Sequence, residues 1–274
     1  MGSKQLLTGA AFTDEKFPII YDDSRLTDGS LMLFDASHSL AALTAPPVHD
    51  QFVNNIAGNT AVSVIPDATP ENTAFQMYNT FSNGSCVFEL TGKGAIHGAV
   101  KNADQAGGRA YLKISDKMRD YFIANPNRDY ALFAWTNCTR VTTSGSNFLD
   151  ITTFYNSVSA ASNSLLFDGL ANTVGRERTT KNAPTGMSGS PNATPALNQG
   201  QIFAWGNANP YDSLNANVGR SVIVYGVHVI DVAASGMTFA ELDARDAALY
   251  AEAFAAGGRY YDDTFTDPDV LAPE

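Results

Sequence analysis

The fold is decided by Ser221-Val-Ile-Val-Tyr-Gly-Val-His-Val-Ile-Asp-Val232. Val, Ile and Tyr fit the pleated, half-buried surface of a sheet, so this run predicts a long strand. Thr238 and Glu241 then have the spacing of a capping box, in which each side chain accepts a hydrogen bond from the other residue's backbone amide. With Gly257-Gly258 as a left-handed stop, the pattern predicts a helix over residues 238–256 that closes the domain.

Upstream of this segment, short β-type runs alternate with turn signals such as Asn83-Gly84 and Asp168-Gly169. Strands are predicted at residues 60–65, 86–90, 110–114, 130–136, 148–155, 164–167 and 201–205. A short helical turn is predicted at residues 117–123. Many short strands with one late helix favour an all-β, mainly antiparallel sandwich over an alternating α/β sheet.

The chain divides into three parts on this pattern. Residues 1–54 carry short apolar pieces broken by Ala45-Pro-Pro-Val48, and we expect an N-terminal arm or leading hairpin there. Residues 55–256 form the predicted sandwich, and residues 257–274 form an extended C-terminal tail. Within the sandwich, residues 175–200 are the longest segment predicted to lack a strand, which is typical of a binding loop.

Charge and hydropathy exclude two classes of partner. The chain has 17 basic and 28 acidic side chains, a net charge of -11, and no clustered basic surface for nucleic acid. No apolar run approaches the ~18 residues that span a bilayer, so we expect no membrane insertion. Cys86 and Cys138 are interpreted as two free, buried thiols, with a single disulfide as the alternative.

No catalytic, cofactor or metal motif is complete. Gly186-Met-Ser-Gly-Ser190 lacks the final glycine position of a nucleophile elbow, and the four histidines are isolated in sequence. Asp22-Asp23 and Asp262-Asp263 are interpreted as solvated turn acids, with calcium coordination as the alternative. We therefore expect no enzyme, no cofactor and no metal; a glycoside hydrolase is the remaining enzymatic alternative, because carboxylates are plentiful.

Aromatic side chains supply the candidate ligand contacts. Trp205 precedes Gly206-Asn207 at a strand exit, and Tyr211 follows close behind, so these two are predicted as glycan contacts. Tyr260 and Tyr261 could also stack on a sugar ring. Trp135 lies within an apolar strand and is assigned to the core.

A family resemblance adds to this reading. Tyr130-Ala-Leu-Phe-Ala-Trp-Thr136 resembles the central strand of concanavalin A-like, laminin-G-type jelly rolls. The strand at residues 222–232 and the capped helix after it are similar to the closing segment of that family. The resemblance covers residues 55–256 and implies a jelly-roll-like β-sandwich. That fold implies no single function.

The composition and terminal segments also resemble those of bacteriophage virion proteins. The chain is rich in Ala, Asn, Thr, Ser and Gly, and Met1–Leu7 lacks the apolar core of a signal peptide. The resemblance implies a non-enzymatic structural component of the virion, tail-associated or a capsid decoration protein. It would assemble through terminal arms as a homo-oligomer, with other virion proteins as partners. The alternative is a lectin-like, carbohydrate-binding module for adhesion to cell-surface glycan.

Overall fold

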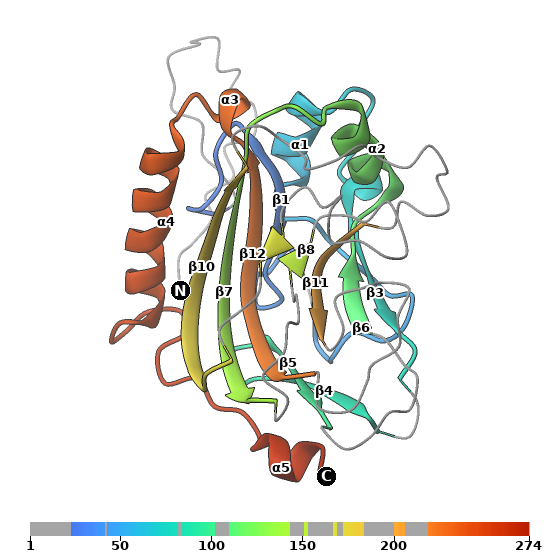
Figure 1. Ribbon diagram of the computed structural model, residues 1–274, viewed down its shortest axis with the longest axis vertical. Coiled ribbons are helices and arrows are strands. Elements are labelled where there is room, and N and C mark those ends of the chain that lie inside the picture. Colours follow the sequence, from blue (N-terminus) through green and yellow to red (C-terminus); the bar gives the residue numbers. More distant parts are fainter. Residues whose placement is uncertain are drawn as a thin grey trace, which may run out of the picture.

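The computed structural model describes residues 23–41, 43–81, 84–101, 110–142, 151–152, 167–168, 172–183, 200–205 and 219–273. Their strands form two main sheets with antiparallel pairings, and a long helix lies outside one sheet (Figure 1). The prediction of a mainly antiparallel, all-β sandwich is therefore confirmed.

The larger sheet has six strands. They are β1 (Ser30–Phe34), β4 (Cys86–Leu90), β5 (Ile96–Val100), β7 (Tyr130–Arg140), β10 (Gly175–Ala183) and β12 (Ser221–Asp231). Their order is β10-β7-β12-β5-β4, and β1 also pairs with β12. The β-branched run Ser221–Val232 thus supplies the central strand of this sheet.

Strand β12 is buried along all of its 11 residues. On one side it pairs with β7 from Ser221 to Asp231. On the other side, β5 pairs with the first half of β12 and β1 pairs with the second half. A register shift between Val224 and Gly226 marks the point where the two partners change over. Continuous burial explains why this strand is apolar throughout and does not alternate with polar residues.

The smaller sheet has four strands in the order β11-β6-β3-β2. They are β2 (Phe52–Val53), β3 (Phe75–Asn79), β6 (Ala110–Lys113) and β11 (Gln201–Trp205). A separate pair joins β8 (Ile151–Thr152) to β9 (Phe167–Asp168). Side chains of the two sheets meet in one core, where Leu132 and Val224 from the larger sheet join Leu112 and Phe203 from the smaller.

The outer face of the larger sheet is covered by α4 (Phe239–Phe254), which follows the short α3 (Val232–Ser235). Figure 1 shows α4 on one side of the larger sheet and the smaller sheet on the other. The capping box of Thr238 and Glu241 is present, and Gly257 has a positive φ of 81°. The predicted closing helix is confirmed, and it covers a face of the larger sheet.

Strand β7 shows how both faces are filled. Leu132 and Ala134 point into the core between the sheets, while Phe133 and Trp135 point outward beneath α4. This is the period-two alternation of a strand, with both faces apolar because both are covered.

One predicted strand is wrong. Residues 60–64 belong to α1 (Gly58–Val64) and Ile65 is its C-cap, in spite of several β-branched side chains. Ala61 and Ile65, four residues apart, are 0% and 2% exposed and both join the core. Burial of this helical face outweighs the weak strand propensity of the segment.

The other helices are short. They are η1 (Glu71–Thr73), α2 (Asp116–Ala124) and α5 (Pro268–Leu271). The predicted helical turn at residues 117–123 lies within α2, whose first turn is capped by Ser115. No helix among the described residues is both long and apolar enough to cross a membrane.

The predicted strand-free segment at residues 175–200 also needs correction. Its first nine residues form β10, which pairs with β7 along its whole length. The polar side chains that favoured a loop belong to an edge strand, most of whose residues are half-buried. Residues 184–199 lie outside the described part of the chain.

The terminal segments are packed on the sandwich wherever they are described. Residues 30–34, within the predicted arm of residues 1–54, form the fully buried β1. That part of the arm is therefore a strand of the larger sheet, because its apolar run Leu31–Phe34 pairs with β12. The predicted tail crosses the outer face of the same sheet, where Tyr260 is 1% exposed and Ala272 is 0% exposed.

Both cysteines are free and buried. Cys86 lies on β4 and Cys138 on β7. Burial raises the pKa of both thiols, which keeps them protonated and unreactive.

Candidate functional site

Trp205, predicted as a glycan contact, is a core residue at the end of β11. Its side chain is 1% exposed, and its indole N–H donates to the carbonyl of Val222 at 3.0 Å. The rings of Phe88 and Phe203 pack edge-on against it. A sugar therefore has no access to this ring. Tyr211, the other predicted contact, lies outside the described residues.

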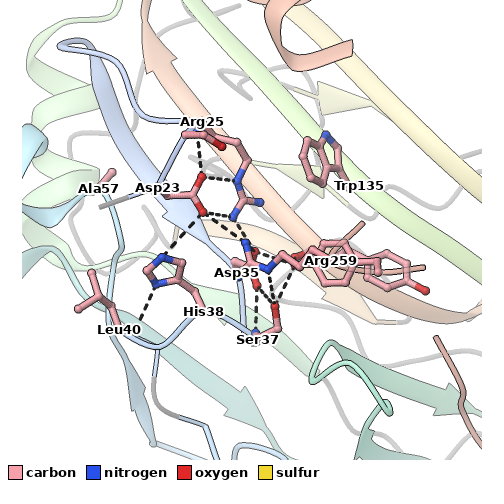
Figure 2. Close-up of polar contacts among 12 residues, drawn as sticks. Asp23, Arg25, Asp35, Ser37, His38, Leu40, Ala57, Trp135 and Arg259 are labelled. Atoms are coloured by element: carbon pink, nitrogen blue, oxygen red, sulfur yellow. Dashed lines mark hydrogen bonds and ion pairs between the residues drawn. The ribbon is translucent and has the colours of Figure 1, made fainter. Parts of the chain in front are cut away.

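The most densely connected polar site is centred on Arg25. Its side chain reaches beneath α4, and its guanidinium lies 5.0 Å from the centroid of the Trp135 ring. Nη2 donates to Asp23 Oδ2 at 2.8 Å and to Asp35 Oδ2 at 2.5 Å, while Nε donates to Asp23 Oδ1 at 3.0 Å. Figure 2 shows the two carboxylates converging on the guanidinium.

The C-terminal tail completes this site, which we call the Arg25 cluster: Asp23, Arg25, Asp35, Arg259 and Tyr260. Nη1 of Arg259 lies 2.9 Å from Asp35 Oδ2 and 3.3 Å from Asp23 Oδ2. The Tyr260 hydroxyl donates to Asp35 Oδ2 at 2.7 Å. Two carboxylates and two guanidinium groups thus balance one another within one hydrogen-bonded cluster (Figure 2).

The pKa shifts report how strongly the charges are paired. Burial alone would raise the pKa of Asp23, but hydrogen bonds to Arg25 and its positive charge outweigh burial and hold the pKa well below its usual value. For Arg25, burial opposes the charged form, yet Asp35 and Asp23 raise the pKa. Burial and the negative charge of Asp35 raise the pKa of Tyr260. Asp23 and Arg25 therefore stay charged, and the phenol of Tyr260 stays neutral.

A second ionic cluster holds α4 to β10. Asp246 of α4 accepts from Arg178 Nε at 2.7 Å and lies 3.2 Å from the indole nitrogen of Trp135. Arg178 also pairs with the carboxylate of Asp243. Burial raises the pKa of Asp246, while its bonds to Arg178 and Trp135 oppose the rise. This cluster fixes the helix on the sheet.

A third cluster joins a carboxylate, an imidazole and a hydroxyl in series, from Glu89, His97 and Thr139. Nδ1 of His97 lies 2.9 Å from Glu89 Oε1, and Nε2 lies 2.9 Å from the hydroxyl of Thr139. Glu89 also accepts two hydrogen bonds of 2.7 Å from the backbone and hydroxyl of Thr266. His97 is fully buried beneath the Phe265 ring, and burial lowers its pKa. These contacts fasten the tail to β4, β5 and β7.

Sequence reasoning missed all three clusters. The prediction of a solvated turn acid is wrong for Asp23, which is 9% exposed and bonded to Arg25. Asp35 follows directly after the apolar run Leu31–Phe34, and a charge so close to a buried strand was a signal that it needed a partner. The described residues contain no group of three or more His, Cys, Asp or Glu placed to hold a metal ion.

Comparisons with known proteins add little. No protein-family model and no curated protein matches the chain. One solved structure with partial similarity is the Trypanosoma rangeli sialidase in complex with 2-keto-3-deoxy-D-glycero-D-galacto-2,3-difluoro-nononic acid. The two share 12% identity at a TM-score of 0.23, over 70% of this chain and 34% of the sialidase. The chain spans about a third of that protein, and so low a TM-score carries no argument about fold or function.

Proposed function

We propose that the protein is a non-enzymatic structural component of a bacteriophage particle, tail-associated or a capsid decoration protein. The observation that carries the proposal is the Arg25 cluster. Its charged groups pair with one another, so their role is to stabilise the fold. It joins residues 23–35, β12 and the C-terminal tail into one rigid unit. A component of a particle needs such rigidity to keep its shape.

Assembly as a homo-oligomer is supported by apolar side chains on the tail. Val270 is 72% exposed and Phe265 is 40% exposed, although the backbone around them is fastened to the sheet. Exposed apolar side chains on an ordered segment are typical of a contact surface. In this proposal the tail contacts neighbouring copies and other virion proteins.

The first test is the mass of the purified protein in solution, measured by light scattering after size-exclusion chromatography. We expect an oligomer for the parent protein and a shift towards the monomer for Val270→Asp. Val48→Asp is the matched control, because Val48 is 66% exposed and lies near the smaller sheet. A strictly monomeric parent protein, or equal effects of the two substitutions, would contradict assembly through the tail.

The second test addresses the particle itself. Bacteriophage particles induced from a strain that carries the gene are purified and analysed by mass spectrometry and immunogold electron microscopy. We expect the protein in stoichiometric amounts, with labels at one position on the head or tail. Particles that lack the protein would overturn the proposal.

The carbohydrate-binding alternative gains no support from Trp205. Trp205 is buried, and Tyr211 lies outside the described residues. A glycan contact would have to use side chains other than Trp205.

A further inference from the structure

A small pocket opens beside the C-terminal end of α4, where the tail crosses the larger sheet. Its volume is about 190 Å³. The sheet contributes Asn137, Arg176 and Tyr225, while the end of α4 and the tail contribute Phe254, Tyr261 and Asp263. Tyr260 lies in the wall of this pocket and also donates to Asp35 of the Arg25 cluster. The pocket shares no other residue with that cluster.

Asp263 contributes a carboxylate, a hydrogen-bond acceptor, to the lining of this pocket. Its Oδ1 accepts from the backbone N–H of Lys93 at 2.7 Å, which fixes the carboxylate in place. Its Oδ2 is buried close to the Tyr225 hydroxyl, but it makes no hydrogen bond of normal length in the described structure. A buried carboxylate oxygen without a donor is costly, so a ligand hydroxyl that donates to it would be favoured.

Arg176 brings donors. Its guanidinium stacks over the ring of Phe254, 4.9 Å from the centroid, and is exposed to solvent. Among the described residues, no hydrogen-bond acceptor contacts it. The ring therefore positions the cation at the pocket while its N–H groups remain available to a ligand.

Tyr261 brings an aromatic face. It is 40% exposed, in contrast to its neighbour Tyr260, which is buried at 1%. The next residue, Asp262, has a φ of 52°, in the left-handed region that Asp tolerates better than most residues. This turn places Tyr261 and Asp263 on the same pocket.

These three kinds of group define the ligand. Sugar hydroxyls both donate and accept, and the C–H face of a sugar ring is apolar, so an acceptor, a donor and an aromatic face together match it. A small anion would be repelled by Asp262 and Asp263, and the described residues form no cation-binding group of acids. We propose that this pocket binds a neutral pyranose ring of a glycan, with Tyr261 stacking on the ring and Asp263 and Arg176 bonding its hydroxyls.

The experiment is saturation-transfer NMR of the purified full chain with the methyl glycosides of glucose, galactose, mannose and N-acetylglucosamine. We expect transfer to at least one of them, strongest on ring C–H protons. Tyr261→Ala should weaken binding by about tenfold, and Asp263→Asn by about tenfold or more, because each removes a contact worth about 1.4 kcal/mol or more. Tyr261→Phe should retain binding, because the aromatic face remains.

Phe52→Ala is the matched control, since Phe52 is an exposed aromatic side chain at 67% on β2, in the other sheet. Unchanged thermal unfolding of the variants shows that a loss of transfer is local. The proposal is overturned by transfer to none of the four sugars, or by transfer that Tyr261→Ala and Asp263→Asn leave intact. Sugar binding does not depend on the proposed role in a particle, because oligomer mass and particle composition are measured separately.

Discussion

The indole of Trp205 lies directly against the backbone of Gly98. A Cβ atom at residue 98 would lie 2.4 Å from Cδ1 and 2.6 Å from Nε1 of Trp205, inside any contact that real side chains make. Gly98 belongs to β5 of the larger sheet and Trp205 to β11 of the smaller one. The absence of a side chain at residue 98 therefore lets the two sheets come together around the largest buried ring.

Gly98→Ala should destabilise the protein by about 1–3 kcal/mol through overpacking, measured by urea unfolding. Trp205→Phe in the same chain should recover part of this loss, because the smaller ring leaves space for the added methyl group. Equal costs of Gly98→Ala in the parent and the Trp205→Phe background would show that the indole is not the cause.

Arg25→Met should destabilise the protein by about 3–5 kcal/mol, because it leaves Asp23 and Asp35 as buried charges with one cation fewer. Arg119→Met is the matched control: Arg119 pairs with Asp116 and Asp120 on the surface of α2. An exposed pair of this kind contributes at most about 1 kcal/mol. Similar unfolding midpoints for the two variants would contradict the role given to the Arg25 cluster.

His228 should make stability depend on pH. Burial, and then the positive charge of Arg25, lower its pKa from 6.5 to about 3, and its Nε2 lies 2.9 Å from the Ser30 hydroxyl. Below pH 6.5 the unfolded chain therefore binds a proton at this residue that the folded chain does not. The free energy of unfolding should fall as the pH drops from 6.5 towards 3, with a contribution of about 1.4 kcal/mol per pH unit from this residue.

The measurement is urea unfolding at a series of pH values above and below 6.5, for the parent and His228→Gln. In the variant, the free energy of unfolding should fall less steeply with decreasing pH, whatever its value at neutral pH. Asp23 adds a further loss at lower pH: its pKa is depressed in the folded state, so its stabilisation disappears as the pH falls below about 4. Parallel profiles for the parent and variant would exclude His228 as the titrating group.

Thr238→Ala should cost about 1 kcal/mol, because the Thr238 hydroxyl accepts from the amide of Glu241 at the start of α4. Glu241→Gln should cost less, since Gln retains an acceptor for the amide of Thr238. Hydrogen exchange of the first turn of α4 distinguishes the two variants. Faster exchange in both to the same extent would show that the Thr hydroxyl is not the main cap.

Local signals predicted the last part of the fold well. The bounds of β12 and the capping box of α4 follow from residues that are neighbours in sequence, and the structure has both. Residues 60–65 and β10 could not be identified in this way. The first is a helix because Ala61 and Ile65 reach the core, and the second is a polar edge strand whose partner, β7, lies more than 30 residues away in sequence.

The Arg25 cluster was not predictable for a related reason. Asp23 and Arg259 are 236 residues apart, and nothing in either sequence neighbourhood points to the other. The sequence shows that Asp35 follows an apolar strand, but it does not show which cationic side chain pairs with its carboxylate. The polar residues after Trp205 favour a ligand contact, whereas its burial depends on Gly98 in the other sheet.

The placement of β12 has a consequence for how the chain folds as it is synthesised. Its partners β1, β5 and β7 all leave the ribosome before it, and Ser30 pairs with Ile230, about 200 residues later. Until residue 231 has been made, these strands have hydrogen-bonding edges that no neighbour covers. Pairings between such distant residues form slowly, so the nascent chain should depend on chaperones or on rapid completion of its C-terminal part to avoid aggregation.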